Sequence, residues 1–141
     1  MTEDGHINPE RAQFEAFKAL PRDTPVNMLN LVRVRDQAEY PDGRLSTGRE
    51  AYEAYGRESA PVLDRVGGSI LWRGSFETVL IGPPQERWDF CFIARYPTAG
   101  AFLAMVTDPD YQQAVVHRTA SVADSRLIRM GELSGGPGFA G

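Results

Sequence analysis

The first strong pattern in the chain is a run of alternating positions over residues 25–35, PVNMLNLVRVR. In an extended strand, successive side chains point to opposite faces. One face would hold Asn27, Leu29, Leu31 and Arg33, and the other Met28, Asn30, Val32 and Val34. Both sets are largely apolar, which predicts a central strand covered on both sides.

Three further strands are predicted where aromatic and β-branched residues gather. They cover residues 69–81, 88–96 and 124–130. Gly74 indicates a bulge or bend within the first of them.

Apolar residues recur at helical spacing in two long segments between these strands. Residues 48–66 carry one such stripe, and Pro61 within it should kink the helix or end its first part. Thr98 is a favourable cap for the next helix, and Asp108 followed by Pro109 restarts it as another. Two helical regions therefore alternate with the strands.

A short helix is also expected near the start of the chain. Asn8 is a suitable cap for it, Phe14 and Phe17 would form its apolar side, and Pro21 should end it. We interpret this segment as an arm that packs on the domain or on a partner subunit.

The resulting order is β-α-β-β-α-β with an added N-terminal helix. This order predicts an α+β, ferredoxin-like fold, in which an antiparallel sheet carries two helices on one face. We divide the chain into an N-terminal helical arm (1–24), a ferredoxin-like domain (25–130) and a flexible tail (131–141) rich in Gly, Ser and Pro. The other face of the sheet is still apolar, so we expect a second copy to cover it in a homodimer.

Composition narrows the class of protein. The 141 residues suffice for one domain with a real core, and 42% of them are hydrophobic. A net charge of -4 gives no broad electrostatic footprint for nucleic acid or anionic membrane. No apolar run approaches the roughly 20 residues of a membrane span. The polar N-terminus does not resemble a signal peptide, which favours a cytoplasmic protein. The single cysteine, Cys91, excludes an intrachain disulfide and a multi-cysteine metal site.

Three segments resemble a known family: AYEAYG, RVGGSILWRG and RYPTAGAFLAMVTDPDYQQAVVHR. The family is the uncharacterised domain-of-unknown-function family numbered thirteen-thirty, in its longer form, within the dimeric α+β-barrel superfamily. The resemblance spans roughly residues 25–130 and implies a dimeric α+β barrel without a settled activity. Shorter relatives carry an acidic residue before the aromatic that closes the strand. Here Ala94 and Arg95 precede Tyr96, so a role for that acid does not transfer.

Arg118 is the most informative anomaly, because it lies on an apolar stripe with Tyr111, Val115 and Val122. Its planar guanidinium could bind the carboxylate or phosphate of a ligand in the cleft between sheet and helices. The alternatives are an ion pair within the protein or a side chain that extends to solvent, and we favour the ion pair. The candidate carboxylates for such a pair are Asp89, Glu77 and Asp124.

Other candidate residues come from position and from analogy. His117 could act as a general base or as a haem ligand, although a half-exposed structural histidine is the simpler interpretation. Cofactor-free monooxygenases and haem-degrading enzymes of the superfamily use an Asn and a Trp in this cleft, which suggests Asn30 and Trp72, with Arg95 beside them. Tyr55 could line the same cleft, or it could simply belong to the core.

We therefore predict a homodimer that binds a small molecule in the cleft and uses no cofactor, metal, nucleic acid or membrane. The candidate lining residues are Asn30, Tyr55, Trp72, Arg95, His117 and Arg118. One alternative is a cofactor-free monooxygenase, isomerase or cyclase that acts on an aromatic or polyketide-like substrate. Another is a structural dimer without catalysis, because no nucleophile–base set is recognisable.

Overall fold

A computed structural model describes residues 5–140. The elements are α1 (Arg11–Ala19), β1 (Val26–Val34), α2 (Gly48–Arg65), β2 (Ser69–Gly74), β3 (Phe90–Tyr96), α3 (Ala99–Val106), α4 (Pro109–Ser121) and β4 (Val122–Met130). Along the described chain, none of the helices combines the length and the apolar character that crossing a membrane requires.

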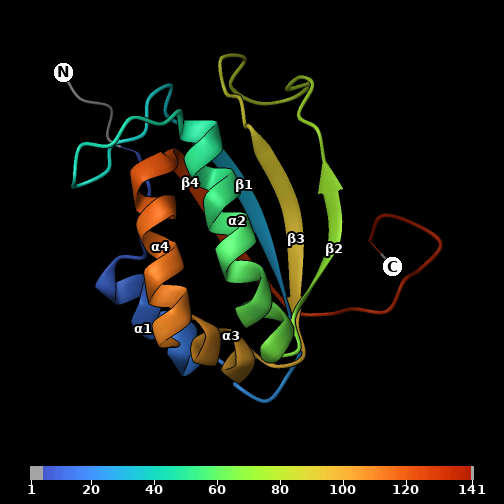
Figure 1. Cartoon of the computed structure of the whole chain (residues 1–141). Helices are drawn as coiled ribbons and strands as arrows, with labels where there is room; N and C mark the ends of the chain where they lie inside the picture. The colour runs from blue at the N-terminus through green and yellow to red at the C-terminus, as the bar shows by residue number, and fades with distance from the viewer. Residues whose placement is uncertain (1–4, 141) are drawn as a thin grey trace.

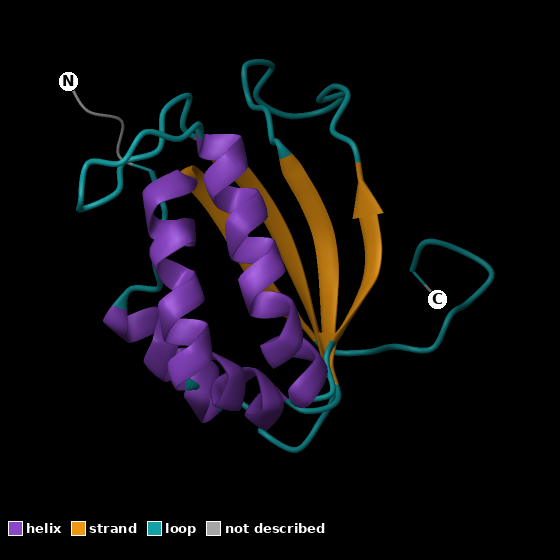
Figure 2. Ribbon diagram, in the orientation of Figure 1, coloured by secondary structure: helices purple, strands orange, loops and turns teal. Residues whose placement is uncertain are grey.

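The strands form one four-stranded antiparallel sheet in the order β2-β3-β1-β4. Helices α2 and α4 lie side by side over one face of this sheet, and α1 and α3 lie at one end of the pair (Figure 1). All the helices are on the same side of the strands, as Figure 2 shows. The predicted ferredoxin-like α+β fold is therefore confirmed.

The alternation in β1 decides which of its side chains enter the core. Val26, Met28 and Val32 are almost fully buried, and they pack with residues of the helices. Leu29 and Leu31 have the opposite parity and are only partly buried, because no described segment of the chain covers that face. The predicted division of β1 into two apolar faces is correct.

Local capping determines where α2 begins. The hydroxyl of Thr47 accepts a hydrogen bond from the backbone N–H of Glu50, and the Glu50 carboxylate accepts one from the N–H of Thr47, both at 3.0 Å. Contrary to one predicted alternative, Pro61 does not end the helix, which continues to Arg65. Gly67 follows with a φ of 85°, a left-handed conformation that glycine adopts without strain.

Several predicted boundaries are wrong. Strand β3 begins at Phe90 and not at residue 88, and β4 begins at Val122 and not at residue 124. Helix α1 begins at Arg11 with Glu10 in the capping position, so Asn8 is not its cap. Strand β2 ends at Gly74 and does not reach residue 81. The Trp72 ring lies over Gly74, where an added Cβ atom would be 2.2 Å from the ring, and the following residues have no partner strand.

The ends of the chain follow the expected division only in outline. Residues 131–140 form no helix or strand and are exposed. Residues 1–4 of the predicted arm and residue 141 of the predicted tail lie outside the described residues. The boundaries at 24 and 130 remain predictions.

Candidate functional site

A cavity of about 1490 Å³ lies between the sheet and the helices. We call it the cleft. Its floor consists of side chains from β1, β2, β3 and β4, and its roof of side chains from α2, α3 and α4, while the N-terminal segment closes one side. Among the lining residues are Asn30, Tyr52, Tyr55, Phe90, Tyr111 and Arg118.

Aromatic rings form a continuous surface along the cleft. The ring centroids of Tyr52 and Phe90 are 4.6 Å apart, those of Tyr52 and Tyr55 are 5.3 Å apart, and those of Tyr55 and Tyr111 are 6.0 Å apart. The hydroxyls of Tyr55 and Tyr111 are hydrogen-bonded at 2.9 Å. Burial raises the pKa of Tyr52 and of Tyr55 above the ordinary tyrosine value, so both phenols keep their protons at neutral pH.

Arg118 lies on the cleft side of α4, as the apolar stripe predicted, but it does not form the ion pair that we expected. One guanidinium nitrogen donates to the carbonyl of Ile7 at 2.6 Å, and another is 3.4 Å from the hydroxyl of Ser125. Asp89 instead accepts from the N–H of Val34, and Asp124 lies near Arg33 and Arg126. The backbone of the N-terminal segment thus takes the place of the carboxylate that we expected beside Arg118. This contact could not be recognised from the sequence.

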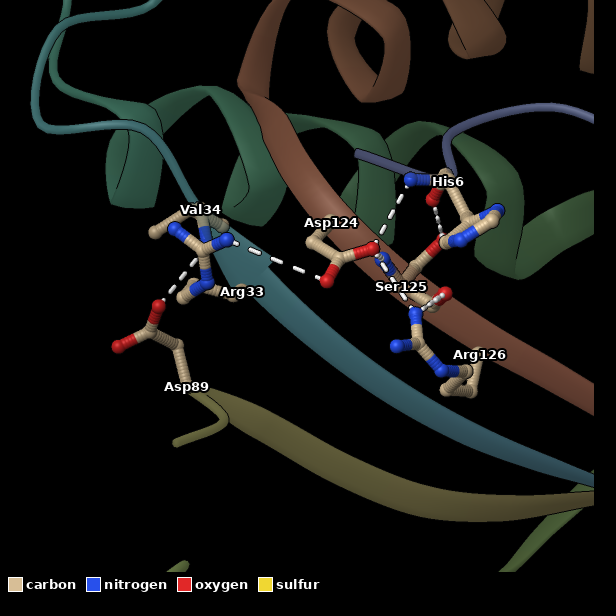
Figure 3. Close-up of polar contacts among 7 residues, drawn as sticks. All are labelled: His6, Arg33, Val34, Asp89, Asp124, Ser125 and Arg126. Carbon is tan, nitrogen blue, oxygen red and sulfur yellow. Dashed lines mark hydrogen bonds and ion pairs between the residues drawn. The ribbon is translucent and has the colours of Figure 1, made fainter. Parts of the chain in front are cut away.

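The backbone of His6 lies beside the start of β4 and is held there by hydrogen bonds to Asp124 and Ser125 (Figure 3). The N–H of His6 donates to Asp124 at 2.9 Å, and the hydroxyl of Ser125 donates to the carbonyl of His6 at 2.6 Å. Asp124 also accepts from Arg126 at 2.9 Å. These bonds, together with that from Arg118, position the His6–Ile7 segment against the cleft.

Three of the predicted site residues line the cleft: Asn30, Tyr55 and Arg118. The side-chain amide of Asn30 donates to the carbonyl of Met28 at 3.0 Å, which leaves its oxygen as a potential acceptor. These three residues come from β1, α2 and α4, and only the fold brings them together.

Trp72 and Arg95 do not line the cleft, which corrects the proposed Asn–Trp arrangement. Trp72 pairs with Ile93, which has the opposite parity to the cleft-lining Phe92 and Ala94. The cause is an irregular register between Ile70 and Trp72, because one extra residue moves every following side chain to the other face.

Arg95 also lies on the face of the sheet away from the helices. Its guanidinium forms an ion pair with Glu132, and Asn27 donates to the same carboxylate at 3.4 Å. This pair explains Arg95 without a ligand.

His117 does not line the cleft either. One ring nitrogen is 2.6 Å from the Tyr40 hydroxyl, and the other is 2.9 Å from the Glu58 carboxylate. Both nitrogens therefore have protein partners, which favours a structural role for His117. Within residues 5–140, no group of three or more His, Cys, Asp or Glu side chains is arranged to hold a metal ion.

Three residues of the cleft were not predicted from the sequence: Phe90 in its wall, and His6 and Ile7 in the segment that closes one side. The alternation along β3 could have placed Phe90 on the same face as Ala94 and Tyr96. The contacts of His6 and Ile7 join residues more than a hundred positions apart, and no local pattern signals them.

Residues 46–131 match the family described as Domain of unknown function (DUF1330). The chain belongs to this family. The match covers α2 through β4, and thus three of the four strands and the three helices that form the roof of the cleft. No curated protein matches the chain.

Solved structures support the same fold. The chain is 53% identical to the RPA0582 protein of Rhodopseudomonas palustris, a protein of unknown function, over 93% of this chain and 99% of that one, with a TM-score of 0.89. A dimeric ferredoxin-like protein of unknown function from Bacteroides fragilis is 12% identical over 77% and 96% of the two chains, with a TM-score of 0.50. A candidate antibiotic biosynthesis monooxygenase from Bacteroides thetaiotaomicron is 17% identical over 82% and 96%, with a TM-score of 0.51. The last two similarities concern the fold alone.

Proposed function

We propose that this protein binds a small molecule in the cleft. The observation that carries the proposal is a cavity of about 1490 Å³ lined by aromatic rings and a few convergent polar groups. Small-molecule sites are typically concave, mainly apolar, and supplied with a few oriented polar side chains. The side-chain oxygen of Asn30, the paired hydroxyls of Tyr55 and Tyr111, and the guanidinium of Arg118 are such groups.

We further propose that the protein acts as a homodimer through the face of the sheet away from the helices. Trp72 and Met130 on this face are 54% and 41% exposed. An apolar sheet face of this kind favours association with a second copy. A dimer formed in this way would leave the cleft open, because the cleft is on the opposite face.

Binding is the function proposed, rather than a specific reaction. The Asn–Trp arrangement that suggested monooxygenase chemistry is not assembled within the chain, because Trp72 lies on the other face of the sheet.

A fragment screen can test ligand binding directly. Neutral and charged aromatic fragments would be titrated into the protein, with amide shifts followed by NMR. We expect shifts at residues that line the cleft, and we expect Gly56→Trp to remove them. Gly56 lines the cleft, and a Cβ atom added there meets no heavy atom within 4 Å. The new ring can therefore occupy the part of the cleft next to Gly56, while the loss of a helical glycine favours α2.

Asp64→Trp is the matched control, because Asp64 is an exposed residue of the same helix and does not line the cleft. It should bind fragments as the unaltered protein does. Fragments that shift only residues outside the cleft, or that bind equally well to Gly56→Trp, would contradict the proposed function.

A further inference from the structure

The charge of Arg118 is directed toward the cleft and is not neutralised by any carboxylate of residues 5–140. No carboxylate oxygen in that range is within 4.0 Å of its guanidinium nitrogens. The two hydrogen-bond partners of Arg118 are a backbone carbonyl and a hydroxyl. A guanidinium carries five N–H donors and keeps its charge at any physiological pH. Two hydrogen bonds leave part of that donor capacity unused. The Ile7 carbonyl, at 2.6 Å, shows that an oxygen acceptor fits beside this group.

The same cleft surrounds this charge with aromatic surface. Tyr111 and Arg118 are on α4, while Tyr52 and Tyr55 face them from α2, and all four line the cleft. Burial dominates the raised pKa of Tyr52 and of Tyr55, and the positive charge of Arg118 acts on both in the opposite direction. The guanidinium and the rings thus belong to one site.

The overall charge of the lining also favours an anion. Six arginines and two glutamates line the cleft, although the whole chain has a net charge of -4. A concave surface of one sign concentrates ligands of the opposite sign.

The other arginines on the β4 side already have partners. Arg129 donates to the carbonyls of Phe17 and Pro21, and Arg126 pairs with Asp124. Neither Arg118 nor Arg129 has a carboxylate oxygen of residues 5–140 within 4.0 Å, but the two differ in their surroundings. Arg129 lies over the Phe17 ring, 4.7 Å from its centroid, whereas Arg118 shares α4 with Tyr111. A guanidinium beside the tyrosine rings suits a singly charged carboxylate, which an arginine can bind through two hydrogen bonds.

We propose that the cleft binds a flat aromatic molecule that carries a carboxylate. Its ring stacks on the surface formed by Tyr52, Tyr55 and Phe90, and its carboxylate accepts hydrogen bonds from Arg118. This inference rests on the proposed function, because it names the chemical class of the ligand in the same cleft.

Calorimetric titration with two matched probes tests the inference. One probe is 2-naphthoate, and the other is 2-naphthamide, which has the same ring and shape without the charge. We expect the unaltered protein to bind 2-naphthoate about tenfold more tightly or better, since a charge-assisted hydrogen bond contributes about that much affinity. Arg118→Gln should reduce the preference to about twofold or less, because the neutral amide retains only ordinary hydrogen bonding.

Two further variants keep the test independent of folding. Arg118→Lys retains the charge but loses the fork, and it should keep a weakened preference for 2-naphthoate. Arg44→Gln removes one positive charge from an exposed ion pair with Asp42 that is not part of the cleft, and it should leave the preference unchanged. Each variant would be compared with the unaltered protein at a temperature below its own melting transition.

The outcomes separate this inference from the proposed function. Equal affinity for the two probes, with both lost in Gly56→Trp, would overturn the carboxylate assignment and leave small-molecule binding intact. A preference for 2-naphthoate that survives in Arg118→Gln would overturn the role of Arg118. If neither probe binds and the fragment screen also finds no ligand in the cleft, both proposals fail.

Discussion

Asp124 is the residue at which the N-terminal segment meets β1 and β4. Its carboxylate accepts from the N–H of His6, the N–H of Ser125 and the guanidinium of Arg126, each at 2.9 Å. Burial acts to raise the pKa of Asp124, but these hydrogen bonds outweigh it and hold the pKa below its ordinary value of 3.8. The ionised form therefore stabilises the folded chain.

The variant Asp124→Asn should lose about 1–3 kcal/mol of the free energy of unfolding at pH 7, because charge-assisted hydrogen bonds are replaced by weaker ones. Since the folded pKa is lowered, this contribution is present above pH 3.8 and is lost as the pH falls through the folded pKa. The difference between variant and unaltered protein should thus shrink in acid. Urea unfolding at pH 7, pH 5 and pH 3 measures it.

Asp64→Asn serves as the control for Asp124→Asn, because Asp64 is exposed. It should change stability little at any of the three pH values. A loss in Asp124→Asn that is equally large at pH 3 and pH 7 would show that the carboxylate charge is not its source.

At the scale of elements, the two ends of the chain differ in how they are held. Helix α1 is tied to the domain by the ring contact of Phe17 with Phe102 at 5.0 Å and by hydrogen bonds from Arg129 to the carbonyls of Phe17 and Pro21. After β4, by contrast, Glu132 makes the main polar contacts through its pairing with Arg95 and Asn27. The arm is thus packed against the domain, while the tail is only lightly attached.

A chain that ends at Met130 should unfold with nearly the same free energy as the full chain, since exposed ion pairs contribute little. A second chain that ends at Glu132 keeps the ion pair with Arg95 and should be indistinguishable from the full protein. Melting temperatures and urea unfolding of all three compare them. A loss of several kcal/mol in both shortened chains would indicate that residues beyond Glu132 pack on the domain or on a partner.

At the scale of the whole molecule, the sheet presents its helix-free face to the surroundings. Ile93 in β3 pairs with Leu29 in β1 and Trp72 in β2, so the three side chains form one apolar patch near the middle of that face. A second copy that covered this patch would complete the layer structure of the sheet.

Ile93→Arg should convert the proposed dimer to a monomer, because it places a charge at the centre of the apolar contact. Sedimentation equilibrium at micromolar concentration measures the change. Val116→Arg is the control, because Val116 is 42% exposed on α4, away from this face. A monomeric unaltered protein, or a dimer that persists in Ile93→Arg, would contradict the proposed interface.

The order of the elements and the alternation of β1 could be predicted from the sequence, because both depend on local spacing and backbone preferences. The sequence also determined that Arg118 lies on an apolar helix face, since helical periodicity alone decides that position. Each of these features depends on residues only a few positions apart, and their spacing can be seen in a single sequence.

Which candidate residues meet in the cleft depends on how the strands and helices pack together. The irregular register of β2 moved Trp72 to the opposite face, and a local pattern cannot reveal how a strand pairs with its neighbour. Likewise, Arg118 meets the carbonyl of Ile7 across 111 positions, where a carboxylate was expected. Pairing register and contacts between distant segments depend on the packing of the whole chain, so the composition of the site was decided at that level.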